Sequence, residues 1–252
     1  MKQKYRLPLI LFSAAAAILR LWQRQGGFES TGLAVPGNLP GRLLPAVLLL
    51  SAAYFLLVSR SLPELDVNRD GLSGHFTFQA DKRSAILAVT GVFIMLPGAG
   101  FMLLHPQKTV HPLLGIFAAA AAVSILYVVF SLYRGDPAAS VVMLVPVCCA
   151  GVFLFWAYRS DASDPVLQAV YIRILASAGL TYNMSELAAF AFRNGSPRRW
   201  TASALISIVL CAAGVTDGRG LASVLLFAGG ALVELSFLTA LRIPNEAIPS
   251  ET

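Results

Sequence analysis

Apolar stretches that approach or reach the length of a membrane-crossing helix constrain the fold of this chain more than any other feature. A hydrocarbon layer of about 30 Å needs roughly 20 apolar residues in helical form to cross it. Such stretches recur along the whole sequence, approximately at residues 7–22, 43–59, 84–104, 112–133, 138–158, 165–192, 200–216 and 220–241. The pattern predicts an all-α, polytopic helical membrane protein with about eight transmembrane helices, in a single transmembrane domain over residues 1–252.

The charge content agrees with this class. Only 13% of the residues are charged and 57% are hydrophobic, whereas soluble domains carry about 25% charged residues. The basic residues are scattered rather than gathered in a stripe, so the net charge of +6 does not indicate a nucleic-acid partner. We expect the lipid bilayer of the cell membrane as the surroundings of a multi-pass protein. The sequence leaves the oligomeric state open.

The first apolar stretch also needs to be compared with a secretory signal peptide. Lys2, Lys4 and Arg6 precede it, as they would in a signal peptide. However, the sequence "RLWQRQGG" that follows contains no small-x-small cleavage site. We therefore expect this stretch to be retained as the first transmembrane helix.

The distribution of basic residues predicts the orientation. If the N-terminus is cytoplasmic, twelve of the 19 lysines and arginines lie in cytoplasmic segments and five in outer segments. Cytoplasmic loops of membrane proteins carry the excess of basic residues. Both termini are therefore expected inside. The main segments outside the membrane are then a cytoplasmic loop at 60–83 and an outer loop at 23–42.

The stretch "DVNRDGLSG" at 66–74 resembles the first half of a calcium-binding EF-hand loop. Such a loop also needs a bidentate glutamate at its twelfth position, and Thr77 stands there. We therefore expect no calcium at this loop and no metal site elsewhere. The alternating "HFTFQAD" that follows is typical of a short strand or interfacial ribbon, whose Phe76 and Phe78 could rest on the membrane interface. Alternatively, the whole stretch is a loop that only joins two helices.

Ionisable residues inside predicted membrane helices are the strongest indication of function in such a chain. Arg20 lies near the outer end of the first helix, where a long side chain extends to the interface, so we expect it at the surface. Arg173 lies in the outer half of the sixth helix. We interpret Arg173 as a charge that faces an anion.

Two glutamates lie in the inner halves of their helices. Glu186 shares one helical face with Gly179, Tyr182 and Asn183, so this polar stripe is expected to face the bundle. Glu234 lies on the last helix at a matching depth. The two carboxyl groups could share a proton or a cation; alternatively, each could accept hydrogen bonds that only hold helices together.

Prolines predict interruptions in two helices. One stretch contains "LPGAG" at 96–100 and another contains Val145-Pro146. Interrupted membrane helices expose backbone groups that can line a binding site, although proline and glycine are also common in membrane helices in general.

These features favour a permease or channel-like protein for a small solute or ion, proton-coupled if Glu186 or Glu234 titrates. The alternative is a non-transporting membrane sensor or partner subunit, with loop 60–83 as its contact surface. No nucleophile, metal or nucleotide-binding motif is present. The sequence thus favours a protein without enzymatic activity and without a cofactor.

Overall fold

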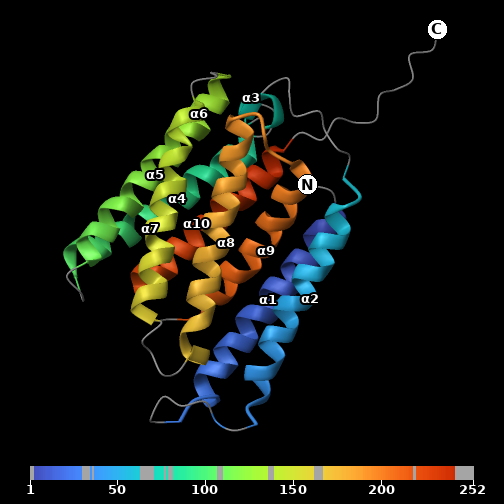
Figure 1. Ribbon diagram of the computed structural model, residues 1–252, viewed down its shortest axis with the longest axis vertical. Coiled ribbons are helices and arrows are strands. Elements are labelled where there is room, and N and C mark those ends of the chain that lie inside the picture. Colours follow the sequence, from blue (N-terminus) through green and yellow to red (C-terminus); the bar gives the residue numbers. More distant parts are fainter. Residues whose placement is uncertain are drawn as a thin grey trace.

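The described part of the chain consists of helices joined by short connections. The computed structural model describes residues 3–29, 35, 37–62, 71–76, 78, 82–106, 110–135, 139–161, 167–217 and 220–241. In these residues no strand occurs (Figure 1). The helices are α1 (Gln3–Gly26), α2 (Leu39–Ser59), α3 (Gly71–His75), α4 (Lys82–Leu104), α5 (His111–Arg134), α6 (Ala139–Val142), α7 (Leu144–Asp161), α8 (Leu167–Ala191), α9 (Pro197–Val215) and α10 (Leu221–Ala240).

Six of these helices are long and apolar enough to cross a membrane, namely α1, α2, α4, α5, α9 and α10. Helix α7 is apolar but shorter. Helix α8 is 25 residues long and carries the polar residues Arg173, Asn183 and Glu186. The expected all-helical membrane class is therefore confirmed at this coarser level.

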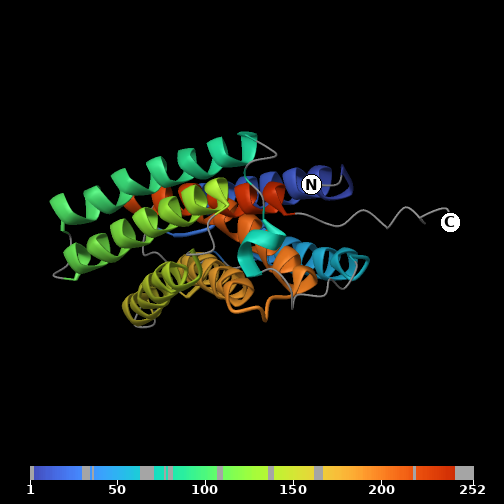
Figure 2. The ribbon, with the colours of Figure 1, turned by 90° about the horizontal axis from the view of Figure 1, so that it is seen from above.

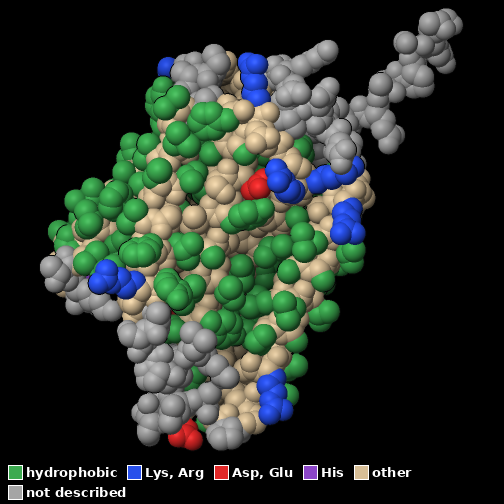
Figure 3. Space-filling view, in the orientation of Figure 1, with side chains coloured by type: hydrophobic (Ala, Val, Ile, Leu, Met, Phe, Trp, Pro, Cys, Tyr) green, Lys and Arg blue, Asp and Glu red, His purple; other side chains and the backbone are tan. Residues whose placement is uncertain are grey.

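The outer surface of the bundle is apolar. Large hydrophobic side chains such as Leu49, Phe93 and Leu104 are exposed by 71%, 63% and 78%. Hydrophobic side chains cover much of the face in Figure 3, and charged ones are few there. In water, contiguous apolar surface of this extent would promote aggregation. In a bilayer it is the surface that contacts lipid.

Helix α10 has α4 and α9 as its main neighbours, and the other long helices pack around these three. Helices α4 and α5 form one layer, and α7 and α8 form another (Figure 2). The pair α1 and α2 packs against α9. The interior is thus built around α9 and α10, which lie late in the sequence.

Small residues bring α4 and α10 close together. A methyl group added at Gly229 would lie 2.5 Å from the carbonyl oxygen of Gly91. One added at Gly91 would lie 2.7 Å from the carbonyl oxygen of Gly229. Glycine is required on both helices because the two backbones touch, as is usual where membrane helices pack closely.

The expected interruptions are confirmed in one helix and wrong in the other. Helix α4 continues through Pro97 without a break. The fifth apolar stretch is interrupted at Met143, between α6 and α7. Pro146 then falls in the first turn of α7, where a proline costs no hydrogen bond.

The segment after the polar loop differs from the expected interfacial ribbon. Residues Gly71–His75 form the short helix α3, and Phe76 pairs with Leu241 in an isolated antiparallel bridge. Phe76 and Phe78 are 1% and 0% exposed, so they are not on the membrane interface. The segment is held by edge-to-face ring contacts from Phe76 to Phe190, Trp200 and Phe237, with centroid distances of 5.0–5.6 Å.

The proposed absence of calcium concerns residues that the structure does not describe. Residues 63–70 and Thr77, which include the candidate ligands, lie outside the described part. The expectation remains a prediction.

Candidate functional site

A buried carboxyl group lies where α8, α9 and α10 meet. Glu234 is only 1% exposed, and its Oε1 accepts a hydrogen bond of 2.8 Å from Nδ2 of Asn183 on α8. Its Oε2 is buried and has no hydrogen-bond partner among the described residues. Ser207 on α9 lies close enough to interact with this carboxyl group, although its hydroxyl makes no hydrogen bond of ordinary geometry.

Asn183 connects this carboxyl group to α9. Its side chain is 1% exposed, and its Oδ1 accepts a hydrogen bond of 2.9 Å from the Ser203 hydroxyl. The same hydroxyl lies 2.9 Å from the Trp200 carbonyl oxygen, so its one proton is shared between two acceptors. A chain of polar groups therefore runs from α9 through α8 to Glu234 on α10.

Glu186 has a different set of partners. The Tyr182 hydroxyl donates to its Oε1 over 3.1 Å, and Nε of Arg199 lies 3.8 Å from its Oε2. The Arg199 side chain is 61% exposed, whereas that of Glu186 is 11% exposed. Glu186 therefore lies at the edge of the bundle, paired with a cation that is largely outside it, and its Oε2 has no hydrogen bond among the described residues.

The structure brings together some of the residues that the sequence singled out. Asn183 and Glu234 are in direct contact, and Tyr182 contacts Glu186. The contacts of the two carboxyl groups are separate from each other. Tyr182 is 52% exposed, which differs from the expectation that the whole stripe faces the bundle. Arg173 belongs to another site, described below.

The surface position expected for Arg20 is wrong. Arg20 is 1% exposed, and its Nε donates to Oδ1 of Asp217 over 3.0 Å. Its Nη2 bonds the same oxygen, and its Nη1 donates to Oε1 of Gln23 over 2.6 Å. An arginine that has a carboxylate within reach inside the bundle has no need to extend to the interface. This ion pair joins α1 to the end of α9.

Two residues in these contacts were missed by sequence reasoning, Arg199 and Asp217. Arg199 lies near the start of α9 and entered the sequence analysis only as one of the basic residues counted for orientation. Asp217 lies just beyond the end of α9 and was not considered there. The one signal that could have found Asp217 is the need of a membrane arginine for a counter-ion. The sequence does not say which of several acidic residues meets that need.

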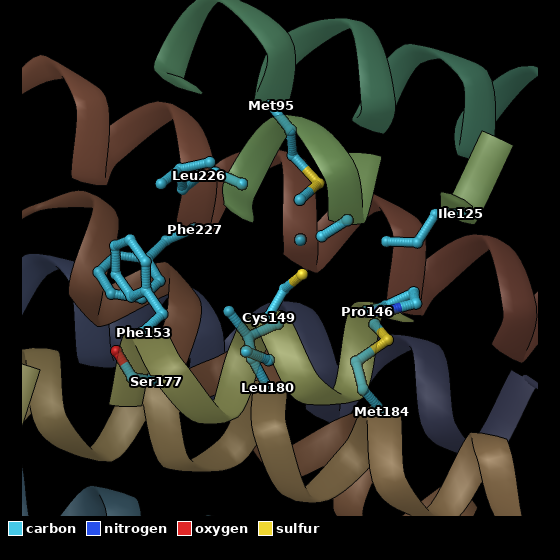
Figure 4. Close-up of a pocket in the computed structure, with 14 residues that line it drawn as sticks. Met95, Ile125, Pro146, Cys149, Phe153, Ser177, Leu180, Met184, Leu226 and Phe227 are labelled. Carbon is cyan, nitrogen blue, oxygen red and sulfur yellow. The ribbon is translucent and has the colours of Figure 1, made fainter. Parts of the chain in front are cut away.

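An apolar cavity lies between α4, α5, α7, α8 and α10. Its volume is about 80 Å³, and its lining includes Met95, Phe153, Met184 and Phe227 (Figure 4). Met184 follows Asn183 directly, and Gly230 in the lining precedes Glu234 by one helical turn. The inner cavity, as we call this space, thus lies next to the buried carboxyl site.

A second pocket lies between the same five helices at the lower end of the bundle in Figure 1. This end is formed by the connections α4–α5, α7–α8 and α9–α10. The pocket has a volume of about 390 Å³. Its lining includes Arg173 of α8, His105 just after α4, His111 of α5, and Phe153 and Trp156 of α7. We call it the lower pocket.

Phe153 lines both spaces. The two cavities are therefore neighbours along the bundle, and this ring is part of the wall between them. No family model, curated protein or solved structure matches the chain.

The chemistry available at these sites is binding and proton exchange. Glu234 can take up a proton or hold a small cation at its unbonded oxygen, because a buried carboxylate needs one or the other. Within the described residues, no three His, Cys, Asp or Glu side chains gather as metal ligands. The lower pocket combines a cation, imidazoles and aromatic rings, which suits an organic solute.

Proposed function

We propose that this protein is a multi-pass permease of the cell membrane that moves a small solute together with a proton carried by Glu234. The observation that supports this most strongly is the pair of neighbouring cavities between the same five helices. Together they extend from the lower end of the bundle to the turn of α10 that precedes Glu234. Permeases need such a sequence of spaces, because the solute must occupy successive sites inside the membrane.

The proton-coupling role is assigned to Glu234 rather than to Glu186. Glu234 is 1% exposed and follows Gly230, which lines the inner cavity, by one helical turn. Both glutamates have one buried carboxyl oxygen without a hydrogen bond among the described residues, so the position of Glu234 decides the assignment. Glu186 has Tyr182 and Arg199 as partners at the edge of the bundle. Ionisable residues inside membranes mark proton and solute pathways. In this proposal Glu186 assists the exchange of protons with water on the inner side.

The proposed topology has eight transmembrane helices and both termini inside the cell. Eight helices of the described part have 18 or more residues, and an 18-residue helix is about 27 Å long. They run alternately down and up in Figure 1. The buried positions of Asn183 and Glu186 let α8 cross the membrane in spite of its polar residues, because these side chains face protein rather than lipid.

The alternative, a sensor or partner subunit that contacts other proteins through loop 60–83, has less support. Two aromatic residues in the described part of this loop, Phe76 and Phe78, pack into the bundle itself. These side chains are therefore unavailable to another protein in this conformation.

A flux screen in proteoliposomes tests the proposal. Small acids, amines, sugars and inorganic ions are added outside, and a trapped pH-sensitive dye reports proton entry. We expect one class to drive proton entry with the wild-type protein, and Glu234→Gln to abolish it while the protein remains folded. Ser185→Ala is the control, since this hydroxyl lies on α8 next to Glu186 but points outward to bond the Tyr182 carbonyl.

Two results would refute the permease function. One is that no solute class drives flux above empty vesicles. The other is that Glu234→Gln transports a solute and protons as well as the wild type. The first result would leave the partner-subunit alternative.

A further inference from the structure

We propose that the lower pocket binds a small organic monocarboxylate with an apolar or aromatic body. The inference deepens the permease proposal and rests on it for the statement that this ligand is the transported solute. The pocket volume of about 390 Å³ lies within the range of small-molecule sites, about 300–1,000 Å³.

The charge of the lining selects an anion. Among the described lining residues, Arg173 is the one that carries a full charge. A guanidinium has five N–H donors in a planar fork that matches a carboxylate, so it can hold a protein partner and still offer donors to a ligand. A single cation suits a monoanion better than a multiply charged one.

Further polar groups line the pocket on the other helices. His105 follows the end of α4, His111 begins α5, and Ser223 adds a hydroxyl from α10. The Ser160 hydroxyl on α7 donates to the Ala157 carbonyl oxygen over 3.2 Å and offers only its oxygen as an acceptor. The His105 ring is stacked on Phe101, with centroids 5.1 Å apart and planes 27° apart, which holds its orientation. The His105 imidazole can offer an N–H to a carboxylate oxygen.

The rest of the wall is aromatic and apolar. Phe101, Phe153 and Trp156 line the pocket together with Met102 and Leu114. A strongly hydrated inorganic anion would meet Arg173, but it would lose its water along the apolar wall without gaining partners there. The apolar part of an organic acid would instead contact the rings. The lining therefore favours an amphipathic anion over phosphate or sulfate.

The inner cavity restricts the ligand further. It is lined by side chains such as Met95, Leu180 and Phe227, and Ser177 is the one hydroxyl-bearing residue among the described lining residues. Carrying a charge through such a space is costly, whereas a neutral molecule crosses at much lower cost. A monocarboxylate becomes neutral by taking up a single proton. Diacids and zwitterions would remain charged or need more protons.

Calorimetry on the full chain in lipid nanodiscs tests the inference, with benzoate, benzylammonium, acetate and phosphate as probes. We expect benzoate to bind at millimolar or lower concentration and more tightly than the other three. Arg173→Gln should weaken benzoate at least about tenfold, because bidentate, charge-assisted hydrogen bonds to carboxylates are among the strong ones. Arg159→Gln is the matched control, because Arg159 is an exposed arginine in the last turn of α7 and does not line the pocket.

A second variant covers the case in which Arg173→Gln fails to fold. Ser223→Phe fills the pocket from α10 and keeps the arginine, and it should abolish benzoate binding as well. The inference is overturned if benzylammonium or phosphate binds as tightly as benzoate. It is also overturned if benzoate fails to bind, or if its binding is unchanged in both variants.

The two proposals fail in different ways. Benzoate that binds at Arg173 but drives no flux in proteoliposomes would refute the permease function and leave the binding site standing. Flux of a cation or sugar, with no benzoate binding, would refute the ligand class and leave the permease function standing.

Discussion

The side-chain amide of Asn183 on α8 donates a 2.8 Å hydrogen bond to the buried carboxyl group of Glu234 on α10, 51 residues away in the sequence. The donor is an uncharged amide, so the hydrogen bond does not require the carboxyl group to be ionised. The carboxyl group therefore remains able to gain or lose a proton. An arginine or lysine in the place of Asn183 would instead fix the carboxylate in its charged form.

The first prediction separates the structural role of Glu234 from its proposed functional role. Glu234→Gln keeps an acceptor oxygen for Asn183, so thermal stability should change little while proton-coupled flux is lost. Glu234→Leu leaves the Asn183 donor buried without a partner, which costs about 1–3 kcal/mol. The melting temperatures of the two purified variants, measured beside their flux, check both statements; equal destabilisation by both substitutions would contradict the assignment.

The second prediction concerns the buried ion pair. Arg20→Met removes the partner of Asp217 and leaves a buried carboxylate, so it should destabilise the protein by about 3–5 kcal/mol. The double variant Arg20→Met with Asp217→Leu removes both charges and should recover most of this loss. A double-mutant cycle in a reversible unfolding assay gives the coupling free energy. A coupling near zero would mean that the pair does not hold α1 to α9.

The third prediction concerns the contact of α4 with α10. Gly229→Ala places a methyl group 2.5 Å from the Gly91 carbonyl oxygen, and such overpacking costs about 1–3 kcal/mol. Gly100→Ala and Gly151→Ala are matched controls, because nothing lies within 4 Å of a methyl group at either position. These controls should be neutral or slightly stabilising, since alanine is the better helix former. Equal melting temperatures for all three variants would refute the close packing.

The fourth prediction tests the wall between the two cavities. Phe153→Ala widens the connection and should raise the flux of the transported solute several-fold, or allow larger solutes to pass. Phe155→Ala serves as the control, because Phe155 lies two residues away on α7 and is 63% exposed on the lipid-facing surface. Flux measurements with solutes of graded size distinguish the two variants. Identical size limits in both would place the pathway elsewhere.

The fifth prediction concerns orientation. With both termini inside the cell, a reporter enzyme that is active only in the cytoplasm should be active when fused after Thr252. The same reporter inserted in the outer loop at 23–42 should be inactive. Activity in the reverse pattern would invert the proposed topology, since the excess of basic residues would then lie outside.

Much of the architecture was available from residue patterns. The apolar stretches predicted the long helices to within a few residues at most of their ends, because burial in lipid requires continuous apolar length and helical hydrogen bonding within each segment. The polar stripe on α8 correctly predicted that Asn183 and Glu186 are buried. The sequence could not assign Asn183 to Glu234, because helical spacing describes neighbours on one helix and says nothing about which other helix faces them.

Two details depended on packing between distant segments. Arg20 was expected at the surface because the sequence shows only how far it lies from the end of its helix. Its partner Asp217 lies 197 residues further on and is brought to it by the packing of α1 against α9. Phe76 was expected at the interface because alternation shows a two-faced segment, whereas the bundle offers it a site among Phe190, Trp200 and Phe237.

The sequence by itself determined that this chain belongs in a lipid bilayer. The mean hydropathy and the length of each apolar stretch indicate this for every helix separately, without knowledge of its neighbours. Tertiary structure alone decided which polar groups meet and where space remains between helices. Hydrogen bonds and ion pairs inside the bundle join residues from different helices, and the cavities arise where five of these helices do not fill the volume between them. Both are properties of the relative position of helices, which no local pattern encodes.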